Sequence, residues 1–249
     1  MSTFDTKQKS VSDVETLIGS FEKHGARWCP AMHKNNRHNG YLTMRVLQEI
    51  FDQNKEWAEK VKTNDPDFFK NLSHHQNPEY LWIGCADSRV PASQIIGMLP
   101  GQVFVHRNIA NIVAHTDLNC LSVIQYAVEV LGIEHIIVCG HYDCGGIKAA
   151  WENKEHGLIG NWLQNIKDVQ RFHQSELDNL HNNREKINRL CELNVIEQVV
   201  NVCQTTIVQG AWKFNRELAV HGWIYGIEDG VLKDLNICVT NSNDIPNRR

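Results

Sequence analysis

Short apolar runs alternate along the chain with longer segments whose apolar positions recur every three or four residues. The short runs predict β-strands and the helical spacing predicts helices between them. The expected strands are 80–84, 102–105, 134–139, 220–225 and 232–239. Asp229–Gly230, between the last two, is a hairpin signal and makes that pair antiparallel.

Helices fill the intervals. They are expected at 41–62, 92–98, 119–131, 145–151, 162–180, 185–203 and 205–218, with a helical turn at 67–72. Strands that alternate with helices indicate an α/β protein, here with a mostly parallel central sheet, an antiparallel edge strand and flanking helices. Residues 41–249 are expected to form one domain, because they hold no repeat or linker. Residues 1–40 are polar and form an N-terminal extension.

The charge and the apolar runs argue against nucleic acid and a membrane as partners. The net charge of the 249 residues is −4 and there is no block of Lys and Arg, so nucleic acid is not expected as a partner. No apolar run reaches the roughly 18–20 residues of a membrane span. The acidic N-terminal segment has no apolar signal core. We expect a cytoplasmic protein, with a mitochondrial location as the alternative.

Eight cysteines are spread over the chain, and without a secretory signal most should be reduced thiols. Five of them lie in or beside apolar runs, where a thiol usually fills the core. These five are Cys120, Cys139, Cys191, Cys203 and Cys238.

The chemistry concentrates where two predicted strands end. Cys85 follows one strand, while His141 and Cys144 follow another. Neighbouring strands of a parallel sheet would deliver these three side chains to one point. Thiolates and imidazole suit zinc, and three protein ligands leave a fourth position for water, as in catalytic sites. A structural zinc site, completed by a distant Cys or His, is the alternative.

Asp87 and Arg89 follow Cys85 closely and can form an ion pair. The pair is either an ordinary surface contact, or it places Asp87 beside the water at the open position. In the second case Asp87 could orient that water or move onto the metal as a ligand. The ion pair with Arg89 would keep Asp87 away from the metal. Gly145 and Gly146 either start a helix or bring backbone N–H groups into the site.

Three segments together carry a resemblance to a known family. These are CADSR (85–89), HRN-x-A-N (106–111) and GH-x-x-CGG (140–146). They resemble the β-class carbonic anhydrases, and the likeness extends from about Gln76 to Val239. The resemblance implies interconversion of carbon dioxide and bicarbonate on one Zn²⁺ per subunit. It also implies ligation by Cys85, His141 and Cys144, control of the fourth position by Asp87 and Arg89, and assembly as a homodimer or dimer of dimers.

Further roles follow from the same resemblance. Gln76 matches a glutamine that reaches the neighbouring subunit's site, and Phe104 and Tyr126 match aromatic residues of the substrate pocket, with core packing as their alternative. Val90 completes the apolar wall that we expect for carbon dioxide. In one branch of the family a second, inhibitory bicarbonate pocket uses a Trp, an Arg and a Tyr. The matching residues are Trp82, Arg107 and Tyr225.

Asp143 departs from the family pattern, because a small residue is common there, and it adds negative charge near the mouth of the site. His106 and His115 are candidate proton shuttles. The alternative functions are a zinc-sensing or redox-sensing regulatory module and a non-catalytic structural member of the same fold. The Asp87–Arg89 pair argues against both, because neither needs it.

Overall fold

The computed structural model describes residues 47–74, 76–152 and 154–246. The chain divides into two units at the Trp57–Ala58 bond, which lies inside helix α2 (Gln48–Asn64). The predicted helix 41–62 is present in α2, and residues 41–46 lie outside the described residues. None of the residues of α2 is buried. A second short helix, α3 (Phe68–His74), precedes the sheet.

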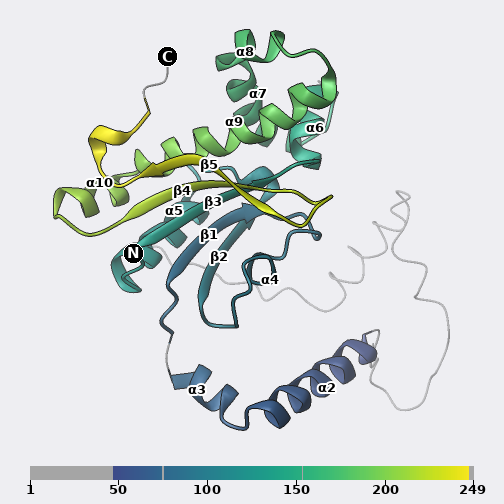
Figure 1. Cartoon of the computed structure of the whole chain (residues 1–249), viewed down its shortest axis with the longest axis vertical. Coiled ribbons are helices and arrows are strands. Elements are labelled where there is room, and N and C mark those ends of the chain that lie inside the picture. Colours follow the sequence, from purple (N-terminus) through teal and green to yellow (C-terminus); the bar gives the residue numbers. More distant parts are fainter. Residues whose placement is uncertain (1–46, 75, 153, 247–249) are drawn as a thin grey trace, which may run out of the picture. The chain divides into compact units, whose positions relative to one another are not determined.

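The centre of the larger unit is a five-stranded sheet in the order β2-β1-β3-β4-β5 (Figure 1). The strands are β1 (Tyr80–Cys85), β2 (Val103–Asn108), β3 (His135–His141), β4 (Ala219–Tyr225) and β5 (Leu232–Val239). All neighbouring pairs are parallel except β4–β5, which is antiparallel. The predicted α/β class and the antiparallel edge are confirmed.

Helices cover both faces of this sheet, and Figure 1 shows α9 and α4 on opposite sides of it. The larger core lies between the strands and α9 (Asn183–Cys203), with α5 (Leu118–Gln125), the π-helix η3 (Tyr126–Val130) and α10 (Thr206–Lys213) beside it. Leu81, Val138 and Val220 supply its strand side. On the other face, Trp82 and Ile137 form a smaller core with the one-turn helix α4 (Ala92–Ile95).

A second region of the core surrounds the carboxyl ends of β1 and β3. It includes α6 (Gly145–Glu152), α7 (Ile159–Phe172) and α8 (Gln174–Asp178), together with the 3₁₀ turn η2 (Ile109–Asn111). A further 3₁₀ turn, η4 (Ser242–Asp244), follows β5. This region holds the side chains of the candidate site.

Several boundaries differ from the prediction, each for a local reason. The predicted helix 162–180 is two helices, because His173 leaves the helical region at φ −106° and ψ 19°. The predicted helix 205–218 ends early, since Asn215 has a φ of 55°. The hairpin uses the longer loop 226–231, in which Gly230 has a φ of 70°. The expected helix 92–98 is shortened to α4.

The seven cysteines within the described residues are free thiols. Four of the five expected core thiols are buried, and the exception is Cys238, which is exposed on the edge strand β5. Cys29 lies outside the described residues. Among the helices that the structure describes, none has the length and apolar character to cross a membrane.

Gly222 on β4 offers a test of how closely β5 and α9 pack around this position. A Cβ atom there would lie 2.5 Å from Ile237 Cγ2, 3.2 Å from Val199 Cγ2 and 3.3 Å from Val195 Cγ1. We expect Gly222→Ala to lower the free energy of unfolding by about 1–3 kcal/mol, measured by urea denaturation.

The matched control is Gly210→Ala in α10, where an added Cβ has no neighbour within 4 Å. It should leave stability unchanged or raise it by up to about 1 kcal/mol, because alanine favours a helix interior. Equal stability of the two variants would contradict the packing described here.

Candidate metal centre

Three metal-competent side chains meet at the carboxyl ends of β1 and β3. The two strands pair directly, with Gly84 opposite Cys139, so Cys85 and His141 both lie where the strands end. Cys144 follows in the turn that leads into α6. The ligand atoms of the three residues lie within 4.8 Å of one another, and all three side chains are buried. The structure therefore brings the predicted ligand set together.

The imidazole of His141 is oriented for coordination. Its Nδ1 lies 2.8 Å from the carbonyl oxygen of Tyr142. A carbonyl can only accept, so Nδ1 carries the proton and Nε2 presents its lone pair. Nε2 is buried and makes no hydrogen bond within the described part of the chain. A buried nitrogen without a partner, aimed at two thiols, is what a metal ligand requires.

The surroundings of Cys85 favour the thiolate form of its side chain. Its Sγ lies 3.9 Å from Cys144 Sγ and accepts a hydrogen bond from the Ala110 N–H at 3.4 Å. The contact with Cys144 is the main cause that lowers the pKa of Cys85, and the Ala110 N–H adds to it. The same contact with Cys85, followed by burial, raises the pKa of Cys144.

The Ala110 N–H reaches Cys85 because of an unusual turn. Ala110 and Asn111 have φ values of 63° and 48°, which non-glycine residues rarely adopt. The Asn108 side chain supports the turn, since it accepts from the Ile112 N–H at 2.8 Å and donates to the Ile112 carbonyl at 2.7 Å. Sequence analysis used the HRN-x-A-N segment only for its family resemblance, and assigned its alanine and asparagines no role in a turn.

The predicted pairing of Asp87 with Arg89 is present at the rim of the cluster. Arg89 Nε donates to Asp87 Oδ1 at 3.0 Å and Nη2 donates to Oδ2 at 2.7 Å. These bonds are the largest cause that holds the pKa of Asp87 well below its usual range. Asp87 Oδ2 lies 3.8 Å from His141 Nε2, so the carboxylate borders the metal position.

Arg107 supports the segment that carries Cys85 and Asp87. Its Nε donates to the Cys85 carbonyl at 2.8 Å, and its Nη2 donates to the Asp87 carbonyl at 2.5 Å. Trp82 and Tyr225 belong to the smaller core cluster on the face of the sheet where Arg107 lies, by strand alternation. The three residues that match a bicarbonate pocket thus share one face.

The other predicted substrate residues fall into two groups. Val90 is buried next to the Asp87–Arg89 turn, and Gly146 lets α6 start against η2, because a Cβ there would lie 2.9 Å from Ile109 Cγ2. Gly145 is exposed at the first residue of α6.

The second group lies farther from the cluster. Phe104 and Tyr126 contact each other, with ring centroids 5.8 Å apart. Phe104 pairs with Leu81, four residues before Cys85, which is about 13 Å along the strand. Gln76 is exposed, ahead of β1.

The two candidate shuttle histidines differ in surroundings. His106 is buried on β2, and burial lowers its pKa. His115 is exposed and donates from Nε2 to the Asn201 carbonyl at 3.1 Å. Both shuttle assignments stay predictions.

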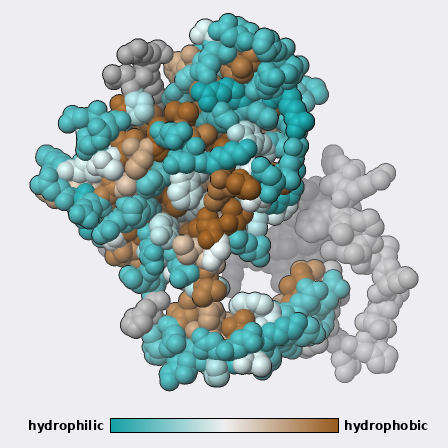
Figure 2. Space-filling view, in the orientation of Figure 1, coloured by the Kyte–Doolittle hydropathy of each residue, from teal (hydrophilic) through white to brown (hydrophobic). Residues whose placement is uncertain are grey.

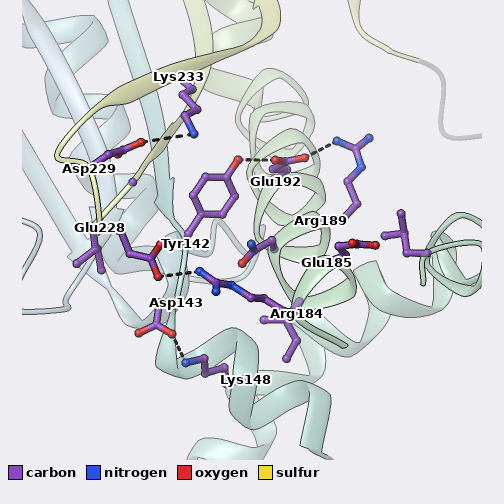
Figure 3. Close-up of a pocket in the computed structure, with 15 residues that line it drawn as sticks. Tyr142, Asp143, Lys148, Arg184, Glu185, Arg189, Glu192, Glu228, Asp229 and Lys233 are labelled. Carbon is purple, nitrogen blue, oxygen red and sulfur yellow. Dashed lines mark hydrogen bonds and ion pairs between the residues drawn. The ribbon is translucent and has the colours of Figure 1, made fainter. Parts of the chain in front are cut away.

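A polar hollow of about 780 Å³ lies beside the cluster, between the β3–α6 turn, α9 and the β4–β5 loop (Figure 3). Figure 3 shows the Tyr142 hydroxyl pointing at Glu192, to which it donates at 2.5 Å. Asp143 points toward Lys148 in the same view, and the two form an ion pair. Sequence analysis assigned no role to Tyr142 or Lys148. The partner of Tyr142, Glu192, lies 50 residues away in the chain and is brought close only by the fold.

Comparison with known proteins agrees with this geometry. The sequence pattern of the family described as "Carbonic anhydrase" matches residues 80–232. A carbonic anhydrase of Emericella nidulans is 51% identical over 189 residues, which are 76% of this chain and 83% of that protein.

Solved structures agree as well. The Coccomyxa beta-carbonic anhydrase in complex with acetazolamide superposes with a TM-score of 0.76 at 40% identity, over 80% of this chain and 90% of that one. One of the two tetrameric beta-carbonic anhydrases of Sordaria macrospora gives a TM-score of 0.75 at 39% identity, over 78% of this chain and 99% of that one. The chain therefore belongs to the β-class carbonic anhydrases and is an enzyme of that family.

Proposed function

We propose that this enzyme catalyses the reversible hydration of carbon dioxide to bicarbonate and a proton, with one Zn²⁺ per subunit held by Cys85, His141 and Cys144. The observation that carries the proposal is the buried cluster, in which three ligand atoms converge and the Nε2 of His141 has no hydrogen-bond partner. When bound, zinc would act as a Lewis acid that lowers the pKa of a water molecule to about 7.

The residues around the cluster prepare it for that chemistry. The Tyr142 carbonyl fixes the tautomer of His141, and the Ala110 N–H favours the thiolate of Cys85. With three protein ligands the fourth position is left for solvent. Asp87 remains a carboxylate near neutral pH and offers an acceptor there, since Arg89 holds its pKa low.

We propose that carbon dioxide lies against an apolar wall built by two subunits. Val90, Gly145 and Gly146 lie on the same chain as the cluster. Phe104 lies near the start of β2, far from Val90, and Tyr126 on η3 contacts Phe104. This distance favours a role for both rings, together with Gln76, in the site of a second copy. They would thus contribute to the partner's pocket.

The exposed apolar residues support a homodimer or dimer of dimers. Ile50 and Phe51 on α2 are 51% and 65% exposed, and Leu118 at the start of α5 is 75% exposed. Figure 2 shows apolar side chains in patches over the sheet-bearing unit and on α2. A mass measurement in solution tests the assembly. The cytoplasmic location stays a prediction, with mitochondria as the alternative.

We also propose an inhibitory bicarbonate site at Trp82, Arg107 and Tyr225. Arg107 already donates to the carbonyls of Cys85 and Asp87. An anion that draws the guanidinium away would therefore loosen the segment that carries Asp87. This contact gives a physical route from the second pocket to the metal centre.

The ligand assignment predicts that Cys85→Ser loses zinc and activity together, because it removes a thiolate ligand. Bound zinc is measured by metal analysis and carbon dioxide hydration by stopped flow. Cys238→Ser is the matched control, since that thiol is exposed on β5 and should leave both unchanged. A Cys85→Ser protein with full metal content and normal hydration would refute the assignment.

The second pocket predicts stronger inhibition by bicarbonate at pH 7 than at pH 8.5. At the lower pH less of the solvent at the metal would be hydroxide, so it would compete less well with the Asp87 carboxylate for that position. Arg107→Ala should relieve this inhibition in steady-state assays and also lower the uninhibited rate, since it removes two hydrogen bonds to the ligand segment. Arg171→Ala, at an exposed arginine on α7, is the control. Inhibition that is the same in both variants would count against the site.

A further inference from the structure

Asp143 shares the guanidinium of Arg89 with Asp87. Arg89 Nη1 donates to Asp143 Oδ2 at 3.2 Å, and Nη2 lies 3.4 Å from the Asp143 carbonyl oxygen. Asp143 lies between two of the cluster residues, His141 and Cys144, while Arg89 lies in the β1–α4 segment. The contact therefore joins the two loops that carry the metal ligands.

The two carboxylates bind different edges of the guanidinium. Asp87 uses the edge formed by Nε and Nη2, at 3.0 and 2.7 Å, while Asp143 Oδ2 takes Nη1. Because arginine is a rigid planar fork, a contact on one edge restricts the orientation that the other edge presents. Asp143 thus supports the Asp87–Arg89 pair and does not compete with it.

Asp143 is itself held in place. Its Oδ1 pairs with Lys148 Nζ, and the Lys148 N–H donates to the Cys144 carbonyl at 3.0 Å in the first turn of α6. Its backbone has a φ of 61°, a conformation that Asp, Asn and Gly adopt more readily than other residues. Figure 3 shows the Lys148 ammonium directed at the Asp143 carboxylate.

We propose that Asp143, supported by Lys148, is a positioning residue that keeps Arg89 on Asp87 and so holds the Asp87 carboxylate off the metal position. The inference rests on the proposed zinc site. Asp87 Oδ2 is already 3.8 Å from His141 Nε2, so a small movement would bring it into the ligand cluster. Loss of the Asp143 contact would favour that movement, and Asp87 would become a fourth protein ligand.

The test is Asp143→Asn in the full-length protein, because asparagine has the same size and tolerates the backbone conformation. Both proteins are loaded with Co²⁺, and two quantities are measured: the visible absorption spectrum and the rate of metal release to a chelator. We expect about a two- to five-fold slower release, the range of one exposed charge pair, and a spectrum altered by replacement of a solvent ligand. Lys148→Met should act in the same direction with a smaller effect.

Asp168→Asn is the matched control, because it removes an Arg–Asp pair whose aspartate is 53% exposed, against 51% for Asp143. It should match the wild-type protein in both measurements. Release and spectra of Asp143→Asn that equal those of the control, or faster release, would overturn the inference. Failure of the wild-type protein to show thiolate-to-cobalt absorption would instead overturn the proposed zinc site, and the inference with it.

Discussion

Direct parallel pairing of β1 with β3 is the constraint on which the candidate metal centre depends. The two strands end next to each other, and each is followed at once by a ligand, Cys85 in one case and His141 in the other. The pairing is secured by apolar side chains on both faces of the sheet. A slip of one residue would turn every side chain of a strand to the opposite face and separate the ligands. Core packing and the assembly of the three candidate ligands are therefore set by one register.

Around the three ligands lies a layer of contacts made largely by the backbone. The Ala110 N–H faces a sulfur, the Tyr142 carbonyl faces an imidazole nitrogen, and Arg107 bonds two carbonyls of the ligand segment. The side chains of this layer act mainly by stabilising the turns that place these backbone groups. Asn108 illustrates this, because its amide supports the η2 turn without touching the cluster.

Sequence analysis could predict the strands, the ligand set and the Asp87–Arg89 pairing, because these follow from apolar runs and from residues close together in the chain. It could not predict contacts that depend on two distant loops, such as Arg89 with Asp143. It also missed the left-handed turn at Ala110 and the break at His173, where tertiary packing overrides local preference. The exposed Cys238 shows that a position in an apolar run does not by itself predict burial, because a run on an edge strand can face solvent.

The apolar side chains on α2 and at the start of α5 have a thermodynamic consequence. Ile50, Phe51 and Leu118 each leave more than half of their surface in water in the single chain. In the proposed homodimer, where a second copy would cover them, folding and association would become one equilibrium. The melting temperature of this protein would then rise with its own concentration, and dilution would act on it as a mild denaturant.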